Sequence, residues 1–195
     1  MEFVALDKTD EETLRRVREL VESLGPPPID LIVVGADETR LEVSDVHILK
    51  ISLPLDRYRV LREVAVAHVL TDPQLMEVWA VPPDVKQDEL AYELSLALLN
   101  RLADVLVAKA DLGLLLERAR MEVVEGETLL YTIVRTFAVD VSASLAVAGL
   151  TSEALRLVAQ LSSHPLYEKY RDFWDFATAN FKFLPIYNWL MLMFS

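Results

Sequence analysis

Cysteine is absent from this chain of 195 residues. The chain therefore has no disulfides, thiolate metal ligands, cysteine-bound iron–sulfur clusters or cysteine nucleophile. Glycine occurs at only five separated positions, so the sequence has no G-x-G-x-x-G, G-x-x-x-x-G-K-[ST] or G-x-S-x-G motif. These absences exclude the usual phosphate-binding loops and the nucleophile elbow of serine hydrolases.

Positive charge is also scarce, with 19 Lys and Arg against 31 Asp and Glu and a formal net charge of -12. Such a field repels phosphate backbones, so we expect no nucleic-acid partner. The N-terminal stretch "MEFVALDKTDEETLRR" has no apolar signal region, and we expect a cytoplasmic protein. Scarce Asn and Gln beside plentiful Glu and Arg are typical of a thermophile protein.

Hydrophobic residues make up 53% of the chain, enough for a sizeable core in one domain, residues 1–195. The N-terminal part, 1–55, predicts a helix with Thr9 as N-cap and three short strands joined by hairpins at 36–39 and 44–45. A helical part, 56–180, and a C-terminal docking segment, 181–195, follow. We therefore predict an α+β fold, with a small, mainly antiparallel three-stranded sheet packed with a larger helical part.

The helical part starts with a helix from Asp56 to about Leu70, because Pro73 pushes the residue before it out of the helical region. After a Pro-rich spacer, apolar residues at helical spacing predict a long helix over 85–110, with Asp84 and Gln87 as a cap pair. Residues 127–150 are rich in β-branched side chains and also suit strands, but we predict a helix there.

The stretch "VLREVAVAHVLTDPQ" places an acid, Glu63, and a histidine, His68, on one apolar helix. Five residues apart, they point roughly 140° from each other, so they cannot share one metal ion or proton. Glu63 lies beside Arg59 and Arg62, which predicts a solvated ion-pair face. His68 lies on the apolar stripe, which predicts a mostly buried ring bonded to a backbone carbonyl or a nearby side chain.

A second polar row on the 85–110 helix consists of Glu89, Glu93, Asn100 and Asp104. Such a row usually faces water. The alternative is a cleft, in which neighbouring carboxylates would shift one another's pKa values.

The order of elements resembles the zincin-type metallopeptidases of the gluzincin branch. A small sheet leads to a helix bearing "REVAV", and a long helix bearing "NRLAD" follows. The family carries H-E-x-x-H on the first helix and E-x-x-x-D on the second. The resemblance places Glu63 at the general base and Asp104 on the second helix. It also places Arg62, Val66 and Asn100 where the three zinc ligands belong, and so implies a zinc-free scaffold. The chain also resembles an uncharacterised archaeal family, which implies no function.

The segment "FLPIYNWLMLMFS" ends a chain whose last 29 residues are rich in aromatic side chains. It is too short to cross a bilayer about 30 Å thick. We predict that it is ordered and docks on its own core or on a partner, with Pro185 ending a preceding helix. A homodimer is the expected partner, and membrane contact is disfavoured because few basic residues flank the segment.

Three functions remain open from the sequence. We favour a non-catalytic scaffold or partner-binding protein, a pseudoenzyme without cofactor or metal. The alternative is a metal-dependent or acid–base hydrolase whose candidate catalytic residues are Glu63, His68, Glu93 and Asp104, with His47 as the alternative to His68. The third is a membrane-peripheral protein that uses its C-terminal aromatics.

Overall fold

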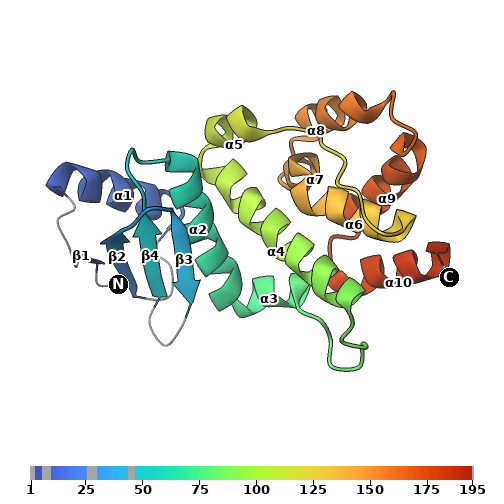
Figure 1. The fold of residues 1–195 in the computed structure, drawn as a ribbon, viewed down its shortest axis with the longest axis horizontal. Coiled ribbons are helices and arrows are strands. Elements are labelled where there is room, and N and C mark those ends of the chain that lie inside the picture. The colour runs from blue at the N-terminus through green and yellow to red at the C-terminus, as the bar shows by residue number, and fades with distance from the viewer. Residues whose placement is uncertain (1–2, 6–9, 26–29, 44–46, 195) are drawn as a thin grey trace.

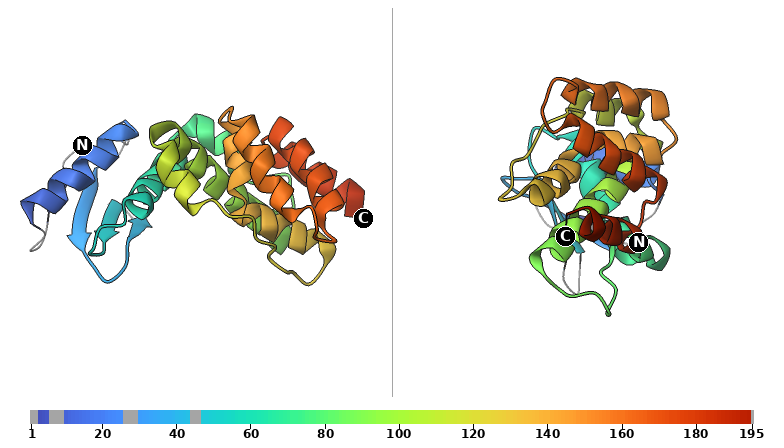
Figure 2. Two further views of the ribbon diagram at one scale, coloured as in Figure 1. Left: turned by 90° about the horizontal axis from the view of Figure 1, so that it is seen from above. Right: turned by 90° about the vertical axis from the view of Figure 1, so that its right-hand side faces the viewer.

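The computed structural model describes residues 3–5, 10–25, 30–43 and 47–194. A small sheet and helix α1 lie at one end of an elongated molecule, and the later helices gather at the other end (Figures 1 and 2). Helix α4 (Glu89–Ala110) runs between the two ends. The predicted α+β class, with a small sheet beside a larger helical part, is confirmed.

Within the described residues, four strands form the sheet, in the order β1-β2-β4-β3. Strands β3 (Arg40–Val43) and β4 (His47–Ile51) pair antiparallel, as expected. Strand β2 (Leu31–Gly35) instead pairs in parallel with β4 and with β1 (Phe3–Ala5). The sheet is therefore mixed: β2 and β3 form no hairpin around 36–39, because β4 lies between them. The expected turn at 44–45 lies outside the described residues.

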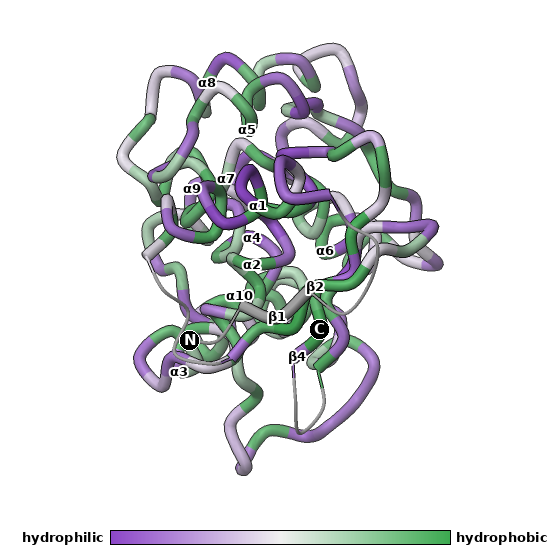
Figure 3. The backbone as a smooth tube through the Cα atoms, turned by 90° about the vertical axis from the view of Figure 1, so that its left-hand side faces the viewer, coloured by the Kyte–Doolittle hydropathy of each residue, from purple (hydrophilic) through white to green (hydrophobic). Residues whose placement is uncertain are grey.

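One face of the sheet is covered by helices α1 (Glu11–Ser23) and α2 (Arg57–Thr71). Leu31 and Val33 of β2 are fully buried and alternate with partly exposed neighbours, as expected when one face of a strand is covered. Figure 3, which looks at the sheet end, shows the chain at β2 as hydrophobic. Asp10 caps α1, and the predicted cap, Thr9, lies outside the described residues.

The caps of the next helices show why they start where they do. Asp56 caps α2 as predicted, by accepting from the Arg59 N–H. Asp72 closes α2 and caps a helix that we did not predict, α3 (Pro73–Trp79), in which proline takes the first turn. Asp88 caps α4, so the predicted start at 85 and the cap pair Asp84–Gln87 were wrong.

The helical part continues with α5 (Leu112–Arg118), α6 (Leu129–Val139), α7 (Val141–Val147), α8 (Thr151–Val158), a 3-10 turn (Ala159–Leu161) and α9 (Tyr167–Ala179). The prediction of helix for 127–150 is correct, but the segment breaks at Asp140, which caps α7. Among the described residues, no single helix has both the length and the apolarity to cross a membrane. Only α6 and α7 together, bent by 65°, meet that test.

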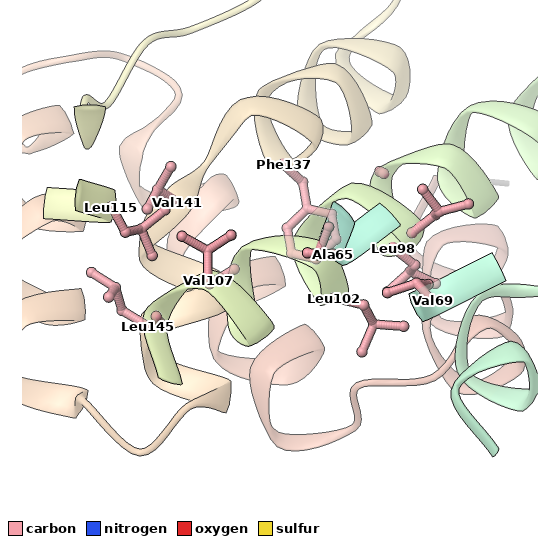
Figure 4. Packing of buried hydrophobic residues seen from close by; sticks show 14 of the residues in the cluster. Ala65, Val69, Leu98, Leu102, Val107, Leu115, Phe137, Val141 and Leu145 are labelled. Atoms are coloured by element: carbon pink, nitrogen blue, oxygen red, sulfur yellow. The ribbon is translucent and has the colours of Figure 1, made fainter. Parts of the chain in front are cut away.

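One hydrophobic cluster joins the sheet end to the helical end. Ala65 and Val69 of α2, Leu98 of α4 and Phe137 of α6 all belong to this cluster (Figure 4). Phe137 also meets Phe173 of α9 edge-on, with ring centroids 5.2 Å apart. Helix α4 is thus the central element of the core.

The C-terminal segment forms helix α10 (Phe183–Phe194) and packs back on its own chain. Trp189 stacks on Phe176 of α9 at 5.5 Å, and Phe183 is buried. This confirms the predicted ordered contact, but Pro185 lies in the first turn of α10, where its missing N–H costs nothing, and does not end a helix. Leu192 remains 80% exposed. The expected homodimer stays a prediction.

Candidate functional site

A cavity of about 510 Å³ lies where the sheet end meets the helical end. Its walls come from the residue before β3, from α2 and α4, from the end of α5, and from the junction of α6 and α7. It is lined by Thr39, Tyr58, Arg59, Arg62, Glu63, Asn100, Arg101, Asp104, Arg118, Ala138, Val139 and Val141. Among the residues that the sequence singled out, Arg62, Glu63, Asn100 and Asp104 meet here.

Another cavity, of about 480 Å³, lies beside α1. It contains none of the candidate residues, and its charged lining includes the exposed Arg57, which faces Asp111 at 3.5 Å. Exposed pairs of this kind contribute little to stability and occur on most surfaces. The cavity around Asp104 is therefore the better candidate for a functional site.

Asp104 is the polar centre of this site and is fully buried. Its Oδ1 lies 3.4 Å from Arg62 Nε and accepts a hydrogen bond of 3.3 Å from the Tyr58 hydroxyl. Its Oδ2 lies 2.8 Å from Arg101 Nη2. A buried carboxylate is tolerated only when cations and donors compensate its lost hydration, and Asp104 has two arginines and a phenol for this purpose.

Arg62 links the two central helices across this site. Its Nη2 donates to Asn100 Oδ1 of α4 at 2.8 Å, while its Nε faces Asp104. The two α4 residues are four apart, so they lie on the same face of that helix. A planar guanidinium suits this double contact because its donors form a fixed fork.

Arg101 is less well satisfied than Arg62. Its side chain is only 4% exposed, yet Nε and Nη1 have no hydrogen-bond partner within the described part of the chain. Asp104 Oδ2 also accepts no well-directed hydrogen bond there, although Arg101 Nη2 is close to it. Buried donors without a partner are rare and cost about 1–3 kcal/mol each, so they need an explanation.

Two further arginines stand at the exposed side of the cavity. Arg118 Nη2 lies 2.9 Å from Asp56 Oδ2, and its guanidinium sits 5.7 Å from the centre of the Tyr58 ring. Arg59 is held more loosely, with Nε 3.9 Å from the same carboxylate. Burial, with a smaller contribution from the Asp104 carboxylate, raises the pKa of Tyr58 to about 12. The phenol is thus a neutral donor at physiological pH.

The structure corrects the prediction for Glu63. The predicted solvated ion-pair face was wrong: Glu63 is half-buried, and its Oε2 accepts a hydrogen bond of 2.8 Å from the Leu41 N–H of β3. Strand β3 is the edge of the sheet, so this N–H points away from β4. Glu63 thus fastens α2 to the edge strand.

The predicted hydrogen bond of His68 to a backbone carbonyl is present, but the ring is less buried than predicted. The ring is half-buried, and Nε2 lies 3.1 Å from the Gly25 carbonyl oxygen, in the segment after α1. Burial lowers the pKa of His68, so the neutral ring predominates at neutral pH. His68 does not line the cavity, and neither does His47, which begins β4. Neither histidine joins the carboxylate row as the hydrolase alternative required.

The polar row on α4 is divided between two environments. Asn100 and Asp104 line the cavity, whereas Glu93 forms a two-pronged contact with Arg135 of α6, the shortest at 2.7 Å. Glu89 lies further along, 3.9 Å from Arg135, and its side chain is 68% exposed. The predicted water-facing row was wrong for Asp104, and the four residues do not form one cluster of carboxylates.

The donor set does not fit a zinc ion. In the ranges that the structure describes, no group of three or more His, Asp and Glu side chains is placed to hold a metal ion. At the positions that the resemblance assigns to zinc ligands, Arg62 and Val66 carry no lone pair for a metal, and Asn100 accepts from Arg62.

Sequence reasoning missed Tyr58, Arg101 and Arg118 as members of this site. Arg101 carried a usable signal, because it stands between buried leucines of the 85–110 helix and three residues before Asp104. Tyr58 and Arg118 carried none, because their contacts with Asp104 and Asp56 join residues 46 and 62 positions apart. No protein family, curated protein or solved structure matches this chain.

Proposed function

We propose that this protein is a non-catalytic binding protein built on a zinc-free, zincin-like scaffold. The family brings ligands from two successive helices to one metal ion. In this chain α2 and α4 bring positions 62 and 100 into contact, with 2.8 Å between the Arg62 and Asn100 side chains. This contact is the observation that carries the proposal, because it joins the two positions that the resemblance assigns to ligands.

The chemistry at these positions favours binding over hydrolysis. A guanidinium in place of a ligand brings a positive charge to the site and offers no lone pair. Glu63, at the position of the family's general base, already accepts the backbone N–H of Leu41. A general base must reach the proton that it removes, and a carboxylate oxygen engaged with the sheet edge is poorly placed to do so.

The test introduces the three zinc ligands of the family into this chain. In the triple variant R62H/V66H/N100E, two histidines four residues apart on α2 and a glutamate on α4 would reproduce the family pattern. We expect this variant to bind one zinc ion per chain in equilibrium dialysis, whereas the unaltered protein binds none. The control R62H/V66H keeps Asn100 and should bind zinc more weakly, because one charged ligand is missing.

Two results would count against the proposal. A folded triple variant without affinity for zinc would mean that α2 and α4 do not have the zincin arrangement. Hydrolysis of casein by the unaltered protein, lost in E63Q, would mean that the protein is an enzyme.

A further inference from the structure

We infer that the cavity around Asp104 binds a small organic anion through a carboxylate or phosphate head group. This inference rests on the proposed function, since it names what a non-catalytic site of this composition would hold. It comes from the arginines in the cavity, the unpartnered donors of Arg101, and the size and apolar wall of the cavity.

The charge of the cavity is opposite to that of the chain. Four arginines line it, against the carboxylates of Glu63 and Asp104. When Asp56, which pairs with Arg118, is included, the four arginines still exceed the three carboxylates by one positive charge. The whole chain carries -12. At physiological salt, charges beyond about 8 Å are largely screened, so the arginines at the cavity dominate for a bound anion.

Arg101 supplies the second observation. Its side chain is 4% exposed, and both Nε and Nη1 lack a partner among the residues that the structure places. These two groups lie on different sides of the guanidinium, so each can donate one charge-assisted hydrogen bond to an oxygen of a carboxylate or phosphate. Because both atoms are closed off from solvent, we expect a small shift of the side chain when the anion binds.

Arg59 and Arg118 are the arginines of the cavity that an anion from solvent would contact first. Their side chains are 60% and 51% exposed, and both share the single carboxylate of Asp56. Two guanidiniums that share one carboxylate keep donors free for another anion. The lining thus contains two exposed arginines, the nearly buried Arg101 and the partly exposed Arg62.

The remaining wall indicates an organic body on the anion. Ala138, Val139 and Val141 at the junction of α6 and α7 add apolar surface to the lining. The volume of about 510 Å³ falls within the range of about 300–1,000 Å³ typical of sites for small organic ligands. An inorganic ion alone would leave most of this space unused.

The test uses probes that share one apolar body. Phenyl phosphate, benzoate and benzyl alcohol differ only in head group, and their binding to the full chain is measured by isothermal titration calorimetry at low salt. We expect one or both anions to bind and the neutral alcohol not to bind. The tighter of the two anions identifies the head group that the site prefers.

The double variant R59Q/R118Q locates the site. Both residues are exposed, so the fold should survive, which circular dichroism checks, and we expect anion affinity to fall by about tenfold or more. The matched control R156Q removes an exposed arginine of α8, away from the cavity, and should leave affinity unchanged. A lower affinity in R62K, which keeps the charge but loses the fork, would add support.

Three results would overturn the inference: no binding of either anion, equal binding of benzyl alcohol, or equal losses in R59Q/R118Q and R156Q. None of these bears on the zinc-binding triple variant. If that variant binds zinc while the anions fail, the scaffold proposal stands and only the ligand is wrong. If the anions bind while the triple variant does not, the ligand stands and the zincin-like scaffold fails.

Discussion

Two buried polar clusters in the same bundle differ in how completely they are satisfied. Between α6, α7 and α9, Asp140 accepts from the Tyr170 hydroxyl at 2.6 Å and from the Ser142 N–H at 2.7 Å. Trp174 donates to the Ser142 hydroxyl at 2.9 Å, so this cluster is closed. Around Asp104, by contrast, Arg101 keeps two unpartnered donors beside a cavity.

This difference in hydrogen bonding is the reason why we treat the Asp140 cluster as structural and the Asp104 cluster as the candidate site. A closed network gains its stability from its own members and fixes the packing of the helices around it. A network with orphaned donors carries a free-energy cost, which a bound ligand or an ordered water would offset. Under the proposed function, incomplete satisfaction rather than burial alone distinguishes the site from the structural cluster.

The largest effect is expected for Asp104→Asn. The change leaves Arg62 and Arg101 without their shared carboxylate, and loss of one partner of a buried ion pair costs about 3–5 kcal/mol. Urea unfolding should show this loss. Asp175→Asn removes an exposed partner of Arg171 and should change stability by less than about 1 kcal/mol. Similar small losses in both variants would refute the role of Asp104 as the polar centre.

A smaller effect is expected for Tyr170→Phe in the closed cluster. Removing the hydroxyl leaves buried Asp140 with its Ser142 contact and the nearby charge of Arg101, at a cost of about 1–3 kcal/mol in urea unfolding. Anion binding should not change, because Tyr170 does not line the cavity. Weaker anion binding in a folded Tyr170→Phe variant would contradict the division between structural cluster and site.

The next smaller loss of stability is expected for Glu63→Ala. Its contact with the Leu41 N–H is charge-assisted but only half-buried, so we expect a loss of about 1–2 kcal/mol. The local readout is hydrogen exchange at the Leu41 amide, which should become faster relative to the amide of Leu49, its neighbour in β4. Unchanged protection at Leu41 would show that Glu63 does not fasten the edge strand.

The smallest effect is a pH dependence due to His68. Burial lowers its pKa in the folded state, so the unfolded chain binds the proton more readily. The stability that His68 contributes is complete above the unfolded pKa of about 6.5 and falls as the pH decreases below it. His68→Gln removes the titration, so the stability difference between the two proteins should change below this pH. A constant difference would contradict the assignment.

The sequence was informative where local chemistry decides the structure. Asp56 as the cap of α2 and the helical reading of 127–150 follow from local patterns. Strand pairing did not follow, because alternation shows which face of β2 is buried but not that β4 is its neighbour. Asp104 was misread because a charged row on a helix usually faces water, and only Arg62, 42 positions away, shows why it is buried.

The most direct test of the account is the zinc content of the unaltered protein. We predict that elemental analysis finds no stoichiometric zinc, even after the folded protein is incubated with zinc and dialysed, because Arg62 and Val66 offer no lone pair where ligands would be needed. One tightly held zinc ion per chain would contradict the claim that this scaffold binds without a metal.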